Sequence, residues 1–259
     1  MSDTGDADRL PQSIGGLIDL GLAAWARHAP LYGALSALIF VLCGAVEMLW
    51  PARTDSATVV KYLVLIYTEL FGLAFVIGAS ALGVAVRVAG KPVSARTLLA
   101  GAIERWPAVL GATVVVSLVV MVTAPYAALG KLPDPPALAL LAAPLTWLLW
   151  GVINLAGPIA ALSGDRPLIA LFSSFPRAIA LSLRRANAVR VCVLGFVTIV
   201  PTLTASILVD VLTKRGAPHV DFWANVPIDT LTVAPLAAIQ TAFALDFARR
   251  AADQRPSAP

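Results

Sequence analysis

Residues 31–50 read LYGALSALIFVLCGAVEMLW, and this stretch decides the fold class of the chain. It is bracketed by Pro30 and Pro51, and its one charged residue is Glu47. A helix of about twenty residues rises about 30 Å, which is the thickness of the hydrocarbon core of a bilayer. The stretch therefore predicts a membrane-spanning helix.

Similar apolar stretches recur along the chain and predict an all-α, polytopic membrane helix bundle. The 259 residues are 59% hydrophobic and 13% charged, whereas a soluble domain is about 45–50% apolar and about 25% charged. Six transmembrane helices are predicted, at about residues 31–50, 59–88, 108–129, 137–162, 191–212 and 228–247. Residues 1–9 are predicted to be a disordered polar N-terminus, residues 10–247 the six-span domain, and residues 248–259 a polar C-terminal tail.

Amphipathic segments precede the first, third and fifth spans. In residues 10–30 the apolar positions have helical spacing, at Ile14, Leu17, Ile18, Leu22 and Trp25. This pattern predicts an amphipathic helix in the membrane interface, and the alternative is the start of a helix that continues into the first span.

The same order of segments suggests a threefold internal repeat of one amphipathic helix and two spans. RHAPLYGA at residues 27–34 resembles RWPAVLGA at residues 105–112. Arg27, Arg105 and Arg185 are 78 and 80 residues apart. A regular spacing of this kind is typical of repeat architectures.

The basic residues predict the orientation of the chain. Of the 19 lysines and arginines, 14 fall at the termini or in the second and fourth connections. Because basic residues are retained on the cytoplasmic side, both termini are predicted to be cytoplasmic, in a bacterial inner membrane. The net charge of +4 is spread between apolar segments, so lipid headgroups are expected as partners and nucleic acid is not.

No catalytic motif is present in the sequence. It contains no phosphate-binding glycine loop, no HExxH zinc motif and no GxSxG nucleophile motif. The two histidines, His28 and His219, are predicted on opposite sides of the membrane. We therefore expect no enzyme activity, no metal site and no cofactor.

Polar residues within the predicted spans form the first set of candidate site residues, because burying such groups in a membrane is costly. They are Glu47, Glu69, Asn154, Asp210 and Gln240. Glu69 lies deep in the second span, where it either lines a cavity that admits a cation or a polar headgroup, or is held by a neighbouring polar group. Prolines within spans 3 to 6 are compatible with the broken helices of transporters and are also tolerated in membrane helices generally.

Arginines at the predicted cytoplasmic surface form the second set, a candidate site for anionic lipid headgroups. They are Arg96, Arg105, Arg177, Arg184, Arg185 and Arg190. The alternative is that these arginines only fix the topology of the chain.

Two stretches carry a resemblance to a known family. They are AGKPVSARTLLAGAIERWPAVLGA, from residue 89, and AGPIAALSGDRPLIALFSSFPRAIALSLRRANAVRVCVLGF, from residue 156. Each has small residues and proline, then an amphipathic helix, then an arginine-rich end. This pattern resembles the six-span membrane domain of bacterial glycerophosphodiester phosphodiesterases and of related standalone membrane proteins. The resemblance transfers no catalytic residue, because we expect no soluble catalytic domain in this chain.

Together these observations predict a non-enzymatic inner-membrane protein that binds or organises lipid or acts as a scaffold subunit. A membrane-protein partner or a homo-oligomer is compatible with this function. The alternative is a small secondary transporter or permease subunit that uses Glu69 and the kinked spans.

Overall fold

The computed structural model describes residues 10–50, 55–92, 94–127, 136–213 and 218–253, and within these ranges the regular structure is helical. The predicted disordered N-terminus and the second half of the predicted tail lie outside the described residues, whereas residues 248–253 of the tail are the end of a helix. In chain order the helices are α1 (Ile14–Arg27), α2 (Ala29–Leu49), α3 (Asp55–Val88), α4 (Ala95–Ala127), α5 (Pro136–Ile153), α6 (Ala156–Leu162), α7 (Pro167–Ser182), the 3₁₀-helix η1 (Arg185–Asn187), α8 (Ala188–Thr213) and α9 (Pro218–Asp253).

Five helical segments of the described chain are long and apolar enough to cross a membrane. They are Ala29–Val46, Ser56–Val88, Ala95–Val120, Leu145–Leu162 and Leu231–Asp253. The chain is therefore a multi-pass membrane protein with an all-α fold. The predicted span at residues 191–212 lies within α8, but most of the side chains in its second half are outside the described residues.

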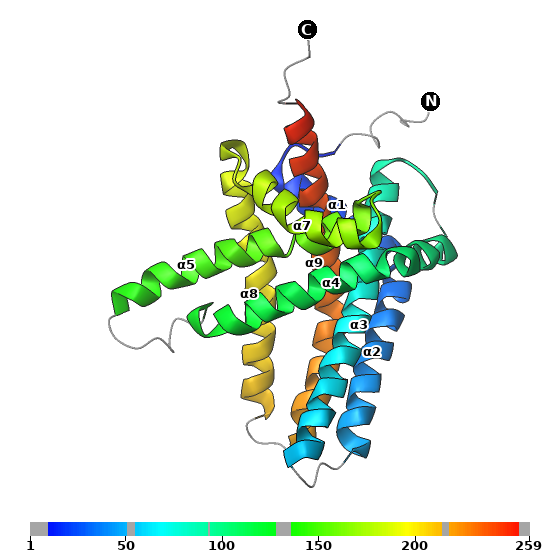
Figure 1. Cartoon of the computed structure of the whole chain (residues 1–259), viewed down its shortest axis with the longest axis vertical. Coiled ribbons are helices and arrows are strands. Elements are labelled where there is room, and N and C mark those ends of the chain that lie inside the picture. The colour runs from blue at the N-terminus through cyan, green and yellow to red at the C-terminus, as the bar shows by residue number, and fades with distance from the viewer. Residues whose placement is uncertain (1–9, 51–54, 93, 128–135, 214–217, 254–259) are drawn as a thin grey trace.

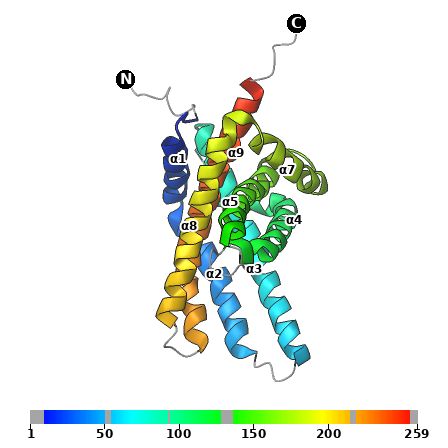
Figure 2. The ribbon, with the colours of Figure 1, turned by 90° about the vertical axis from the view of Figure 1, so that its left-hand side faces the viewer.

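Helix α9 is the centre of the bundle and packs against α1, α2, α3 and α8 (Figure 1). The largest apolar core forms around its C-terminal half, where Phe243 and Phe247 are fully buried beside Leu17 of α1 and Leu194 of α8. Helices α4 and α5 run obliquely across this group, and Figure 2 shows both of them nearly end on. The bundle is thus built of two sets of helices that cross each other.

Helix α1 does form, and its apolar face packs against protein. Ser13 begins the helix, since its hydroxyl oxygen accepts a hydrogen bond from the Gly16 amide at 3.0 Å. Gly21 lies so close to α9 that a Cβ there would be 2.7 Å from the Cα of Ile239. Only His28 separates α1 from α2. The predicted amphipathic helix thus has α9 as the neighbour of its buried face.

The segment before the third span forms no helix of its own. Helix α4 runs from Ala95 to Ala127 without a break and contains both the amphipathic residues and the predicted span. Pro107 lies at the junction of the two parts, but α4 continues through it. The middle unit of the predicted repeat therefore has α4 and α5, whereas the first has α1, α2 and α3.

The fourth predicted span is broken near its end, between α5 and α6. Pro158 has no amide hydrogen to donate to the Asn154 carbonyl, four residues earlier, and its ring would clash there. The Leu155 amide instead donates to the Val152 carbonyl at 3.2 Å, which tightens the turn. The Asn154 side chain caps this region by donating from Nδ2 to the Trp150 carbonyl at 2.8 Å. A proline in the sequence thus places Asn154 at a helix break.

Glycines allow α5 and α8 to approach closely. A Cβ at Gly195 would lie 2.6 Å from the Trp147 carbonyl oxygen, and one at Gly151 would lie 2.9 Å from the Gly195 nitrogen. Backbone atoms on both sides leave no flexible side chain that could move away. Small residues at such crossings are how membrane helices pack tightly.

We expect Gly195→Ala to lower the free energy of unfolding by about 1–3 kcal/mol, because it overpacks a backbone contact. The measurement is the midpoint of thermal unfolding in one mild detergent, followed by circular dichroism. Gly33→Ala is the matched control, since nothing lies within 4 Å of a Cβ at Gly33 in α2, and alanine there should stabilise the helix by up to about 1 kcal/mol. Equal midpoints for the two variants would contradict the close crossing.

Candidate functional site

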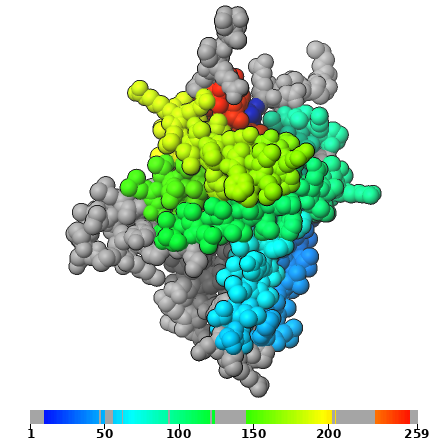
Figure 3. All heavy atoms as spheres, viewed as in Figure 1, coloured from blue at the N-terminus to red at the C-terminus, as the bar shows by residue number. Residues whose placement is uncertain are grey.

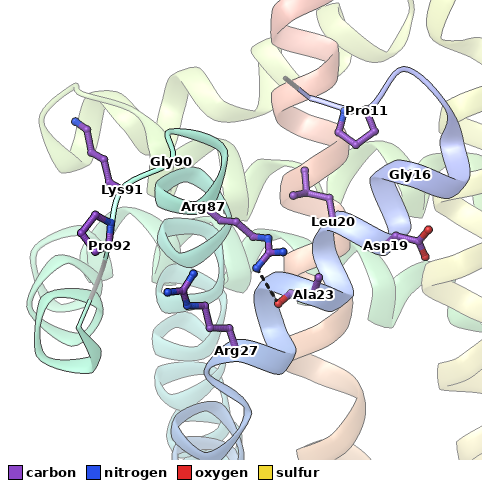
Figure 4. Close-up of a pocket in the computed structure, with 10 residues that line it drawn as sticks. All are labelled: Pro11, Gly16, Asp19, Leu20, Ala23, Arg27, Arg87, Gly90, Lys91 and Pro92. Carbon is purple, nitrogen blue, oxygen red and sulfur yellow. Dashed lines mark hydrogen bonds between the residues drawn. The ribbon is translucent and has the colours of Figure 1, made fainter. Parts of the chain in front are cut away.

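A cavity of about 730 Å³ lies between α1 and the end of α3, and we call it the basic cavity (Figure 4). Helix α1 contributes Asp19, Leu20, Ala23 and Arg27 to its lining. The end of α3 and the turn after it contribute Arg87, Gly90, Lys91 and Pro92. Its volume is within the range of about 300–1,000 Å³ that is usual for ligand sites.

The turn after α3 places Lys91 at the rim of this cavity. Gly90 has a φ of 64°, in the left-handed region that glycine adopts without a steric penalty. The Lys91 amide donates to the Val86 carbonyl at 3.1 Å and the Gly90 amide to the Arg87 carbonyl at 3.0 Å. These two bonds form a Schellman motif, which ends the helix and turns the chain.

Two guanidinium groups lie between α1 and α3. Arg27 is in the last turn of α1, and Arg87 is in the last turn of α3, where the partial negative charge of a helix end favours cations. Arg87 donates from Nη1 to the Ala23 carbonyl of α1 at 3.4 Å. Figure 4 shows both guanidinium groups in the space between the helices, while the Asp19 carboxylate points away to the other side of α1.

The cations of the basic cavity have no carboxylate partner in the part of the chain that the structure describes. The ion pairs found there involve other arginines, and none includes Arg27, Arg87 or Lys91. A small satellite cavity is lined by the same three residues and His28, and the buried Nε2 of His28 has no hydrogen-bond partner among the described groups. The arrangement is suited to binding an anion.

The basic cavity was not among the predicted sites. Arg27 and Arg87 were assigned only to the basic side of the chain, because their closeness depends on the packing of α1 against α3. One feature of the sequence could have indicated this cavity. Each arginine lies at the C-terminal end of an apolar helical segment, and both ends are predicted on the same side of the membrane.

Most of the predicted headgroup arginines lie elsewhere, and they do not form one site. Arg96 and Arg185 are exposed, and Arg184 is partly buried. Arg105 and Arg177 meet at Asp165, and Arg190 meets Asp246. The structure thus divides the predicted set between two carboxylate clusters and the surface.

Asp246 of α9 is the centre of the first cluster, and its side chain is fully buried. Three arginines surround it: Arg249 donates to Oδ1 at 2.6 Å, Arg250 donates to Oδ2 at 2.7 Å, and the Nε of Arg190 lies 3.1 Å from Oδ2. These arginines also donate to backbone carbonyls of the segment before α1, at Leu10 and Gln12. The cluster therefore ties the N-terminal segment to α8 and α9.

Asp165, in the turn between α6 and α7, is the centre of the second cluster. The Ser163 hydroxyl donates to its Oδ2 at 2.8 Å, and Arg177 of α7 donates to the same atom at 2.9 Å. Arg105 of α4 donates to the Asp165 backbone carbonyl at 3.0 Å. The hydrogen bond from Ser163, followed by that from Arg177, lowers the pKa of Asp165. This cluster joins α7 to α4.

Three of the five predicted intramembrane polar residues meet at a second cavity, of about 430 Å³. Glu69 of α3, Asn154 at the α5–α6 break and Gln240 of α9 all contribute to its lining. We call it the Glu69 cavity. The side chains of the other two, Glu47 and Asp210, lie outside the described residues. Within the described chain, no group of histidine, cysteine or acidic side chains could hold a metal ion.

Comparison of the chain with protein-family profiles, curated proteins and solved structures finds no match. The resemblance to the membrane domain of the phosphodiesterases therefore stays a prediction.

We expect Asp246→Asn to lower the free energy of unfolding by about 3 kcal/mol, because it leaves three partly buried arginines without their counter-charge. The same change should make the segment before α1 more sensitive to limited proteolysis. Asp253→Asn, at an exposed position near the end of the same helix, is the matched control and should have little effect. An unchanged unfolding midpoint for Asp246→Asn would rule out the proposed anchor.

The depressed pKa of Asp165 gives a second test. Because its pKa is lower in the folded chain, the carboxylate stabilises the fold above its unfolded pKa of about 3.9, and this contribution is lost as the pH falls through the folded value. Ser163→Ala should move the pKa of Asp165 upward, as measured by carboxyl-carbon NMR of labelled aspartate. Ser173→Ala is the control, since that hydroxyl donates to the Ala170 carbonyl of its own helix. Equal titration of Asp165 in the two variants would contradict the hydrogen bond.

Proposed function

We propose that this protein is a non-enzymatic, multi-pass membrane protein that binds an anionic phospholipid in the basic cavity. The observation that carries the proposal is the meeting of Arg27 and Arg87 at one cavity that Lys91 also lines, without a carboxylate partner among the described residues. Elsewhere in the described chain, the carboxylates of Asp246 and Asp165 form ion pairs with nearby arginines.

A phosphate group has the chemistry that this cavity requires. Arginine presents a planar set of donors that can bind two phosphate oxygens at once. Each basic residue near an anionic leaflet contributes about 1 kcal/mol of attraction. Arg87 is already held against α1 by its bond to the Ala23 carbonyl, so less side-chain entropy is lost when the ligand binds.

Helix α7 supports a membrane interface at the same end of the molecule. It packs inward through small residues at a spacing of four, namely Ala170, Ser174, Ala178 and Ser182. On its other face, Leu168, Phe172 and Leu183 are each more than 70% exposed. Figure 3 shows α7 spread over the outside of the bundle above α4. Large apolar side chains on the outside of an amphipathic helix suit the boundary between headgroups and acyl chains.

The proposal includes a topology of six spans in a bacterial inner membrane, with both termini of the chain in the cytoplasm. Contacts between Arg249 and the Leu10 carbonyl bring the beginning of the described chain to the end of α9, which supports an even number of crossings. Helices α1 and α7 are the interfacial helices of the proposal, whereas in the middle unit of the threefold repeat the amphipathic residues are continuous with α4. Descent from the membrane domain that the sequence resembles is also part of the proposal.

Transport is the second candidate function. The observation that favours it is the meeting of Glu69, Asn154 and Gln240 at one cavity within the helices. Polar groups around a helix break at this depth are how secondary transporters hold their substrates. A role as a scaffold subunit is compatible with either function and has no separate observation to favour it.

The lipid proposal is tested by native mass spectrometry of the full chain in a mild detergent with added phosphatidylglycerol. We expect a retained phospholipid adduct, and a loss of affinity of at least tenfold in the double variant Arg27→Gln with Arg87→Gln. The physical reason is the loss of two charge-assisted hydrogen bonds to phosphate, each with a net contribution of about 1.5–3 kcal/mol.

The matched control removes the same charge from exposed arginines, with Arg96→Gln and Arg185→Gln together. It should keep the adduct. Loss of the adduct in this control alone would move the site to the arginines predicted from the sequence. An adduct that survives in both double variants, or that forms equally with phosphatidylcholine, would overturn the proposal.

A further inference from the structure

We propose that the Glu69 cavity binds a monovalent organic cation with an apolar body. This site is separate from the basic cavity, so the two proposals can fail independently. The cavity lies where α4, α5 and α6 cross α3 and α9. Its volume of about 430 Å³ is enough for a small organic molecule and larger than a single metal ion needs.

Two polar groups of the cavity have acceptor atoms that remain for a ligand. The Thr113 hydroxyl donates to the Val109 carbonyl of its own helix at 2.8 Å, so its oxygen lone pairs remain for a ligand. Asn154 uses Nδ2 on the Trp150 carbonyl, which leaves Oδ1 as an acceptor. With the Glu69 carboxylate, these atoms favour a ligand that is positively charged or donates hydrogen bonds.

Gln240 adds a second polar group that a ligand in the cavity could bind. Its side chain is only 7% exposed and lines the cavity, yet no hydrogen-bond partner for its amide is found in the part of the chain that the structure describes. Polar side chains inside a membrane protein are normally hydrogen-bonded. A ligand or water in the cavity would satisfy it.

Trp150 provides an aromatic surface for a cation. Its Nε1 donates to the Thr123 hydroxyl at 2.8 Å, and that hydroxyl donates to the Val119 carbonyl at 2.7 Å. These two bonds fix the orientation of the indole, which lines the cavity. Tryptophan binds organic cations over its ring face more strongly than the other aromatic residues.

The charge of the cavity is not balanced by the residues that line it. No lysine, arginine or histidine is among the described lining residues, whereas Glu69 carries a carboxyl group. The rest of the lining is largely aliphatic and includes Leu73, Val116 and Leu236. Ionising a carboxyl group in such surroundings is costly unless a cation lies close to it, and the aliphatic walls favour a cation with an apolar body.

The exposed side chain of Glu69 shows how such a ligand would enter. Residue 69 is 14 positions into α3, or about 21 Å from its start at helical rise. The cavity therefore opens sideways at a depth within the predicted span, where a cation that partitions into lipid can reach the carboxylate directly.

The probe for this proposal is tetraphenylphosphonium, with tetraphenylborate as a control of similar shape and opposite charge. Binding of each ion to the full chain is measured by equilibrium dialysis, with the same detergent on both sides. We expect saturable binding of one tetraphenylphosphonium per chain and no saturable binding of tetraphenylborate.

Glu69→Gln should weaken the affinity for tetraphenylphosphonium at least tenfold. Gln240→Leu, which keeps the charge of the cavity, should weaken it severalfold and gives a second readout if Glu69→Gln is not monodisperse. Glu104→Gln removes an exposed carboxylate of α4 outside the cavity and should bind as the unmodified chain does. Equal saturable binding of the two ions, no saturable binding of either, or full affinity in both cavity variants would overturn the proposal.

Discussion

The buried carboxylate of Asp246 is the constraint on which much of the described structure depends. A fully buried carboxylate requires compensation, and three arginines from the end of α9 and the start of α8 supply it. The same guanidinium groups hold the backbone just before α1. They thereby set the position of α1 along α9, where Gly21 allows close contact. The other side of α1 then faces the end of α3 and forms one wall of the basic cavity.

The helices could largely be predicted from the sequence, because apolar stretches of about twenty residues have few alternatives in a membrane. The structure confirms the all-α fold and five membrane-length helical segments. Boundaries were less predictable. The amphipathic residues before the third span are continuous with it in α4, and the fourth span breaks at Asn154. Pro158 was visible as a kink signal, but whether a proline bends or breaks a helix depends on the neighbours that satisfy the released carbonyl.

The sequence predicted the polar residues of the Glu69 cavity but not the basic cavity, and the difference has a physical reason. Polar residues within apolar spans are costly wherever they lie, so Glu69, Asn154 and Gln240 stood out singly, and the structure brings them together. An arginine at the end of a span has a low free-energy cost in many structural settings, so its position in the sequence says little about its role. Its role depends on whether a carboxylate lies beside it, and that is decided by packing. Arg177 and Arg190 have such partners, whereas Arg27 and Arg87 have none among the described residues.

The two cavities have opposite charge, and their positions explain how one bundle can contain both. The basic cavity lies at the end of α1 and α3, where positive side chains would favour the cytoplasmic side and anionic headgroups under the proposed topology. The Glu69 cavity lies among the helices, and no basic side chain is found in its described lining. Its carboxyl group is therefore the group with the highest free-energy cost inside the membrane. Helix α3 joins them, since Glu69 and Arg87 are 18 residues apart on it, a rise of about 27 Å. That distance is too great for one small ligand to reach both groups, so the two proposed ligands, an anionic lipid and an organic cation, would not compete for one site.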